Sequence, residues 1–98
     1  SSRNRLLSKR GINIARNIFQ ILKYTKEHFF QNQDIQKAEA FGKELFNENG
    51  IEYDYLNFVN PKYFEAPDKN QKKLLLITAA YVEGIRLIDN MEVIQWET

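Results

Sequence analysis

The sequence predicts an α+β fold in which two N-terminal helices pack on a small three-stranded antiparallel sheet. The first half of the chain has helical periodicity, and the second half has short segments rich in β-branched and aromatic residues. A chain of 98 residues is long enough for one small domain only. Because a helical stripe buries itself by covering one face of a sheet, we expect residues 8–49 to form the helical layer and residues 51–96 the sheet.

The first helix is expected between Ser8 and Phe30. Ser8 is the predicted N-cap, because its hydroxyl can accept a hydrogen bond from an unpaired N–H of the first turn. Gly11 weakens that turn by about 1 kcal/mol relative to alanine. The sequence therefore does not determine at which residue the helix begins. Residues spaced by three or four positions are predicted to form its apolar face, namely Ala15, Ile18, Phe19 and Leu22, widened by Ile14 and Ile21.

A second helix is expected to open at Asp34, after the polar residues 31–33, and to end at Asn49-Gly50, where glycine can take the left-handed conformation. Its apolar face is predicted to contain Ile35, Ala38, Phe41 and Leu45.

Three strands are expected in the second half. The first lies within Glu52–Asn60, and residues 60–73, which include both prolines, read as a solvated loop. Leu74–Val82 and Ile85–Ile88 flank Glu83-Gly84, which is typical of a hairpin. Residues 92–96 either extend the sheet or fray at the terminus.

Composition excludes several classes of function. Fourteen Lys and Arg residues against 13 Asp and Glu give a net charge of +1, too small to favour nucleic acid or an anionic membrane as a partner. The longest apolar run, Leu74–Val82, is far shorter than the roughly 20 residues of a membrane-spanning helix. The chain has no cysteine, which excludes disulfides and thiolate metal sites and suits the reducing cytoplasm, where we expect the protein.

Common catalytic constellations do not occur in the sequence. His28 is the only histidine and is expected to be a capping or surface residue, so no metal site is predicted. The four glycines are scattered and form no phosphate-binding loop. Arg86 should lie on the opposite face of its strand from Ile85 and Leu87 and form an ion pair with Glu52, Asp54 or Asp89, with ligand binding as the alternative.

Asp89 and Asn90 are expected at the end of a strand, as a turn or cap, with a polar site in a cleft as the alternative.

The segment Ser1-Ser2-Arg3-Asn4-Arg5 places hydroxyl and guanidinium donors close together, which suits phosphate binding. The alternative is a flexible polar terminus that binds no ligand. The chain starts with serine and its only methionine is Met91, so we expect it to be a piece of a longer polypeptide.

Four motifs resemble, in order and spacing, the C-terminal domain of the pantothenate synthetase family, the pantoate:β-alanine ligases. They are Ser1-Ser2-Arg3-Asn4, Asp54-Tyr55, Asn60-Pro61 and Arg86-Leu87-Ile88-Asp89-Asn90. The resemblance covers nearly the whole chain. It departs from the family pattern after Leu7-Ser8, where the family has proline and acidic residues and this chain has Lys9-Arg10-Gly11.

The resemblance implies an AMP-forming ligase that makes the C–N amide bond of pantothenate. ATP adenylates the carboxylate of pantoate and pyrophosphate leaves, the amine of β-alanine then displaces AMP, and Mg²⁺ balances the phosphate charge. It also implies that residues 1–98 form a lid, with residues 1–7 as ATP-phosphate loop and hinge. The N-terminal nucleotidyltransferase domain, which binds pantoate and most of the ATP, is absent, so this chain alone should be inactive. The parent enzyme is expected to be a homodimer.

Carried over residue by residue, the resemblance assigns Ser1, Ser2 and Arg3 to the ATP phosphates. Arg3 is the expected catalytic residue, because its charge would stabilise the departing pyrophosphate. Arg86, Asp89 and Asn90 match a family motif but keep a structural interpretation. A stand-alone protein–protein interaction module, using the helix pair or a sheet face, is the rival hypothesis.

Overall fold

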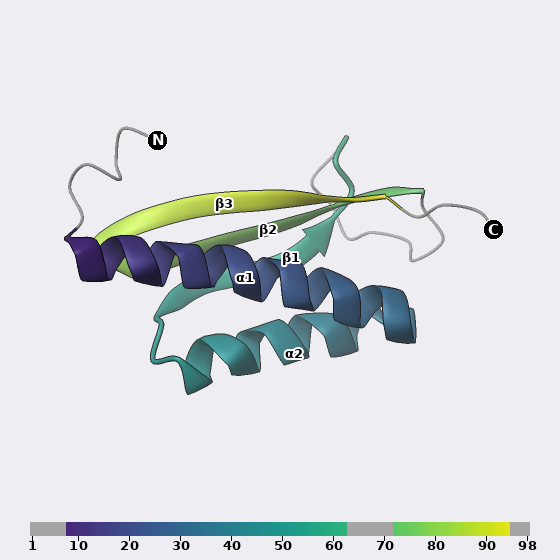
Figure 1. Cartoon of the computed structure of the whole chain (residues 1–98). Helices are drawn as coiled ribbons and strands as arrows, with labels where there is room; N and C mark the ends of the chain where they lie inside the picture. Colours follow the sequence, from purple (N-terminus) through teal and green to yellow (C-terminus); the bar gives the residue numbers. More distant parts are fainter. Residues whose placement is uncertain (1–7, 63–71, 95–98) are drawn as a thin grey trace.

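The computed structural model describes residues 8–62 and 72–94, in which two helices lie on one face of a three-stranded antiparallel sheet (Figure 1). The sheet order is β1-β2-β3, so the strands are neighbours in the order of the chain. The predicted α+β fold is thereby confirmed. The elements are α1 (Lys9–Asn32), α2 (Ile35–Glu48), β1 (Tyr53–Val59), β2 (Lys73–Val82) and β3 (Ile85–Ile94).

The helix boundaries follow from local hydrogen bonds at capping residues. The Ser8 hydroxyl accepts the Gly11 N–H at 3.1 Å, which confirms Ser8 as the N-cap of α1. At the other end Gln33 takes the left-handed conformation with φ 53° and donates its N–H to the carbonyl of Phe29. α1 therefore ends at Asn32, two positions beyond the predicted end at Phe30.

α2 is bounded as the sequence predicts. Asp34 is its N-cap and accepts the Lys37 N–H at 3.0 Å. After the helix, Gly50 has φ +66° and Ile51 donates its N–H to the carbonyl of Phe46 at 2.9 Å. This pairing across a left-handed glycine is the Schellman arrangement, which turns the chain toward β1.

The buried faces of the helices differ in part from the predicted ones. The sequence predicts Phe19 in the apolar stripe of α1, but its side chain is 48% exposed. The buried line of α1 instead runs through Ile18, Ile21, Leu22, Thr25 and Phe29. On α2 the fully buried positions are Ala38, Gly42 and Phe46, whereas Phe41 and Leu45 are half-buried. The reason is that each helix packs against both its partner and the sheet, which rotates the buried stripe.

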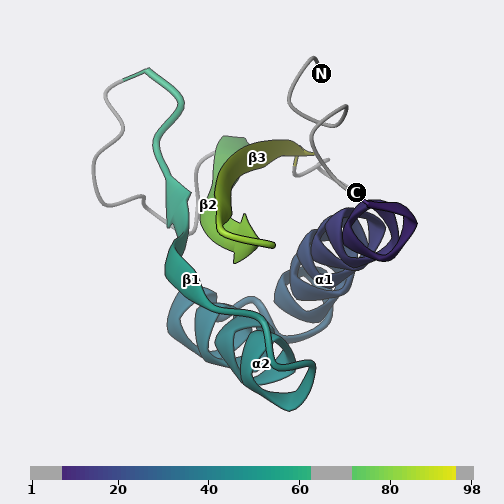
Figure 2. The ribbon, with the colours of Figure 1, turned by 90° about the vertical axis from the view of Figure 1, so that its left-hand side faces the viewer.

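α1 lies beneath β2 and β3, and α2 lies beneath β1 (Figure 2). α2 packs tightly at Gly42, where an added Cβ would clash with Thr25 of α1 and Leu56 of β1. Here the absence of a side chain allows the close contact between α2, α1 and the sheet. In the part of the chain that the structure describes, no helix has the length and apolar character needed to cross a membrane.

The hairpin between β2 and β3 is confirmed. Its two turn residues, Glu83 and Gly84, both have positive φ, 52° and 80°, as a two-residue type I′ turn requires. β3 continues to Ile94, so residues 92–94 extend the sheet, while residues 95–98 lie outside the described residues. β2 begins at Lys73, which pairs with Ile94, one residue before the predicted start at Leu74, and residues 63–71 of the predicted loop lie outside the described residues.

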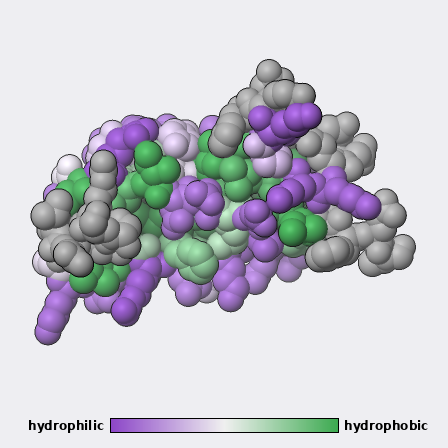
Figure 3. Space-filling model, turned by 90° about the horizontal axis from the view of Figure 1, so that it is seen from above, coloured by the Kyte–Doolittle hydropathy of each residue, from purple (hydrophilic) through white to green (hydrophobic). Residues whose placement is uncertain are grey.

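The two faces of the sheet differ in environment. Alternate residues of β2 face the helices and are buried: Leu74, Leu76, Thr78, Ala80 and Val82. The opposite face, seen from above in Figure 3, has hydrophobic and hydrophilic residues interspersed.

Candidate functional site

The predicted phosphate-binding residues Ser1, Ser2 and Arg3 lie outside the described residues. Ser8 is the first described residue, so the structure shows the point at which the predicted phosphate segment joins α1. This junction is the part of the candidate site whose geometry the structure describes.

Ser8 is held by a residue that is distant in the sequence, in the turn between β2 and β3. Its backbone N–H donates to Oε1 of Glu83 at 2.9 Å, and its hydroxyl donates to Oε2 of the same carboxylate at 2.5 Å. The two residues are 75 positions apart in the sequence. Because Glu83 is the first residue of the β2–β3 turn, these bonds tie the start of α1 to the end of the sheet.

The electrostatics of the junction favour an ionised carboxylate. The pKa of Glu83 lies below its ordinary value, chiefly because the Ser8 hydroxyl donates to it, then because the Ser8 backbone N–H does, with a further contribution from Arg10. Negative charge is also favourable at a helix N-terminus. The Glu83 carboxylate thus accepts both hydrogen bonds that Ser8 can donate from its backbone N–H and its hydroxyl.

From the sequence, Glu83 is predicted only as a turn residue, and its contact with Ser8 is missed. One signal was present. The helix begins with serine at the N-cap but has Gly11 three positions later, where a capping box has Glu or Gln. The N-cap N–H therefore lacks its usual local acceptor, and the sequence does not reveal which distant residue replaces it.

A second polar cluster lies on the face of the sheet away from the helices. Arg86 Nε donates to Oδ2 of Asp54 at 2.8 Å, and the Tyr81 hydroxyl donates to the same oxygen at 2.9 Å. Of the three partners considered for Arg86, the structure therefore selects Asp54. Asp54 sits where the β1–β2 register shifts between Tyr53 and Tyr55, so the cluster secures a bulge.

The expectation that Asp89 and Asn90 lie at the end of a strand is wrong. Both lie in the middle of β3, where they pair with Thr78 and Ile77 of β2. The strand continues past them because β2 is long enough to supply partners as far as Lys73. Their polar character instead follows their half-buried and exposed positions on this edge strand.

Asp89 lines a groove between the first half of α1 and β3. The groove has a volume of about 450 Å³ and is lined by two charged side chains, Arg16 and Asp89, together with the apolar side chains of Ile12, Ala15, Ile18, Phe19, Leu87 and Ile88. Phe19 and Ile88 are 48% and 63% exposed, so this groove accounts for two of the large exposed hydrophobic residues.

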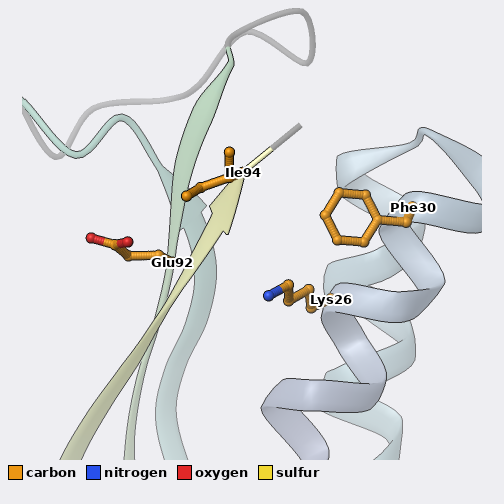
Figure 4. Close-up of a pocket in the computed structure, with 4 residues that line it drawn as sticks. All are labelled: Lys26, Phe30, Glu92 and Ile94. Carbon is orange, nitrogen blue, oxygen red and sulfur yellow. The ribbon is translucent and has the colours of Figure 1, made fainter. Parts of the chain in front are cut away.

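A second hollow, of about 580 Å³, lies farther along between α1 and β3 (Figure 4). Lys26 and Phe30 line it from α1, and Glu92 and Ile94 line it from β3. Figure 4 shows that Glu92 points away from Lys26, and its carboxylate pairs with Lys73 at 3.4 Å. Among the described residues, the hollow therefore has the Lys26 ammonium group beside the apolar side chains of Phe30 and Ile94.

His28 contributes to packing between the helices. Its ring stacks on Phe41 with the ring centroids 4.5 Å apart. Among residues 8–62 and 72–94, no group of three or more His, Cys, Asp or Glu side chains is placed to hold a metal ion. The described residues therefore do not form a Mg²⁺ site, and none is assigned to this ion.

Comparison with known proteins gives a consistent result. The family model described as pantoate-beta-alanine ligase matches residues 1–92. The chain is similar to the pantothenate synthetase of Cytophaga hutchinsonii, with 38% identity over 96% of this chain and 35% of that protein. That of Marinobacter nauticus is 33% identical over 95% of this chain and 33% of its own length. A pantothenate synthetase crystal structure from Thermus thermophilus superposes with a TM-score of 0.86 at 28% identity, over 97% of this chain and 35% of the other. The chain thus spans about a third of the length of these relatives.

Proposed function

Because the chain belongs to the pantoate-beta-alanine ligase family, we propose that it is the C-terminal lid domain of a longer ATP-dependent ligase. In the proposed reaction the carboxylate of pantoate attacks the α-phosphorus of ATP, and pyrophosphate leaves. The amine of β-alanine then attacks the acyl carbon of pantoyl adenylate, and AMP leaves with the bonding electrons as pantothenate forms. The lid would comprise residues 1–98, with residues 1–7 as phosphate segment and hinge.

The observation that carries this proposal is the extent of the match. The family likeness runs over nearly all of the chain in both sequence and fold, yet the chain corresponds to only a third of its relatives. A separate nucleotidyltransferase domain would supply the sites for pantoate and β-alanine and the contacts of a homodimer. The 98-residue chain alone is then inactive.

Within the chain we assign Ser1, Ser2 and Arg3 to the ATP phosphates, on the resemblance of this motif to the family pattern. Hydroxyl and guanidinium groups donate charge-assisted hydrogen bonds to phosphate oxygens. Arg3 is the proposed catalytic residue, because negative charge grows on the pyrophosphate as it leaves. Loss of one such donor costs about 10² to 10³ in rate.

The test measures pyrophosphate release by the full-length polypeptide, with and without pantoate. Arg3→Ala is compared with Arg16→Ala, which removes an exposed arginine from α1. We expect release only with pantoate, a loss of about a hundredfold or more in Arg3→Ala, and none in Arg16→Ala. Activity without impairment in Arg3→Ala would refute the site assignment, and absence of pantoate-dependent release would refute the ligase.

A stand-alone interaction module is the second candidate, and the exposed Phe19 and Ile88 of the α1–β3 groove favour it. Apolar side chains gathered on a surface commonly mark a contact with another protein. Sedimentation of the 98-residue chain separates the two. A lid remains monomeric or associates weakly, whereas a dedicated module forms a complex of fixed stoichiometry with a specific partner.

A further inference from the structure

We propose that Glu83 is a positioning residue of the ligase, which fixes the junction between the phosphate segment, residues 1–7, and α1. It does so by completing, from the β2–β3 turn, the capping box that the first turn of α1 lacks. This inference rests on the proposed function and adds to it a residue that the family motifs do not include.

The hydrogen bonds reproduce the two halves of a capping box. In that arrangement the N-cap hydroxyl accepts the N–H of the third helical residue, whose Glu or Gln side chain accepts the N-cap N–H. The first bond is present, since the Ser8 hydroxyl accepts the Gly11 N–H. Gly11 is buried and has no side chain to make the second. Glu83 makes it instead, with its carboxylate 2.9 Å from the Ser8 nitrogen.

The backbone of Glu83 is also unusual for a glutamate. Its φ of 52° lies in the left-handed region, and the first position of a type I′ turn favours Asn, Asp or Gly. An unfavourable conformation that persists at one residue points to a use for its side chain. The contacts with Ser8 provide that use, because only a side chain of this length at the turn reaches both donors.

The contact changes what holds the phosphate segment. A local capping box would fix the N-cap relative to α1 alone, whereas Glu83 ties it to the β2–β3 hairpin as well. Groups that stabilise a transition state must be held within a fraction of an ångström, and supporting hydrogen bonds supply that accuracy. Ser8, the residue that follows the proposed phosphate segment in the sequence, is thereby anchored to two elements.

The sharpest variant is Glu83→Asn. Asparagine is favoured at positive φ and keeps the hairpin, but its side chain is one methylene shorter and cannot reach Ser8. Glu83→Gln keeps the reach and one acceptor oxygen for the Ser8 N–H. Glu44→Asn is the matched control, because Glu44 is an exposed glutamate on α2.

The full-length polypeptide is assayed for pantoate-dependent pyrophosphate release over a range of ATP concentrations. Pantoate affinity is measured by calorimetry without ATP, and exchange of the Ser8 amide by mass spectrometry. We expect Glu83→Asn to speed exchange at Ser8 and to lower kcat/KM for ATP by about tenfold to a hundredfold, the range that a misplacement of up to 1 Å produces. Pantoate affinity should not change. Glu83→Gln should fall in between, and Glu44→Asn should match the wild type.

Two results would overturn the inference while leaving the proposed function intact. One is faster Ser8 exchange in Glu83→Asn with unchanged ATP kinetics, which would make the contact a helix cap only. The other is an equal loss of pantoate affinity and ATP kinetics, which would indicate general damage to the fold. If the wild-type polypeptide releases no pyrophosphate with pantoate, the proposed function fails and the inference fails with it.

Discussion

Arg86 on β3 and Asp54 on β1 form an ion pair that crosses the middle strand of the sheet, with Nε and Oδ2 2.8 Å apart. Tyr81 on β2 donates to the same carboxylate oxygen and is the register partner of Arg86. All three strands are thus joined at one end of the sheet. The two charged side chains are 42% and 40% exposed, so the pair contributes little to stability and mainly orients the bulge at Asp54.

The pKa of Asp54 should report this pair. It lies below the ordinary value of 3.8, because Arg86 donates a hydrogen bond to it and, to a smaller extent, because Tyr81 does. A lowered carboxyl pKa gives stability that is present above pH 3.8 and is lost as the pH falls through the folded-state value. In Arg86→Ala we expect the pKa of Asp54 to rise toward 3.8, measured by NMR titration of its carboxyl carbon. Lys73→Ala, which removes the pair with Glu92, is the control, and equal Asp54 titrations in Arg86→Ala and the control would contradict this account.

Gly42→Ala should destabilise the domain, although alanine stabilises an exposed helical site by about 1 kcal/mol. A Cβ at this position would clash with the side chains of Thr25 and Leu56. Overpacking of this kind costs about 1–3 kcal/mol, measured as the free energy of unfolding in urea. Thr25→Ala removes one of the clashing groups, so the double variant should lose less than the sum of the single variants. A stabilising effect of Gly42→Ala would show that the helices are not tightly packed here.

Glu39 of α2 forms a hydrogen bond with the backbone of β1, an outer strand of the sheet. Its carboxylate accepts the Phe58 N–H at 2.8 Å. Burial raises the pKa of Glu39 above its ordinary 4.5, while the bond from Phe58 and the charge of Lys43 lower it less. Because the folded state binds this proton more tightly, the contribution of Glu39 to stability falls as the pH rises above 4.5.

Two substitutions of Glu39 separate the effect of its ionisation on stability from the effect of its hydrogen bond with the Phe58 N–H. Glu39→Gln keeps an acceptor for Phe58 and removes the ionisation, so we expect its stability relative to wild type to increase from pH 4.5 upward and then to level off. Glu39→Ala leaves the Phe58 N–H without this partner and should cost about 1 kcal/mol. Urea unfolding at several pH values measures both effects. A constant difference between Glu39→Gln and wild type at all pH values would exclude the raised pKa.

The features that the sequence predicted correctly depend on local chemistry. Ser8 and Asp34 cap the helices through bonds to residues three positions away, and Gly50 ends α2 through its own backbone conformation. Such signals need no knowledge of distant residues. The hairpin at Glu83-Gly84 belongs to the same group, since its turn type follows from two adjacent residues.

The features that the sequence missed depend on tertiary contacts. Phe19 has the spacing of a core residue, but the position of β3 leaves it at the rim of a groove. The polar character of Asp89 predicts the end of a strand, but β2 pairs with β3 beyond this residue and the strand continues. The contact of Glu83 with Ser8 joins residues 75 positions apart, and no local pattern encodes it. For the candidate site, Ser1, Ser2 and Arg3 stay predictions.

The hairpin turn offers a test of backbone conformation without any change in packing. Gly84 has φ +80°, and a Cβ added there would meet no atom within 4 Å. The cost of Gly84→Ala should therefore come from the left-handed conformation alone, about 1–2 kcal/mol. Asparagine tolerates this region, so Gly84→Asn should lose clearly less than Gly84→Ala although its side chain is larger. Urea unfolding of the two variants gives the comparison, and an equal or greater loss in Gly84→Asn would mean that side-chain volume, not φ, decides the residue at this turn.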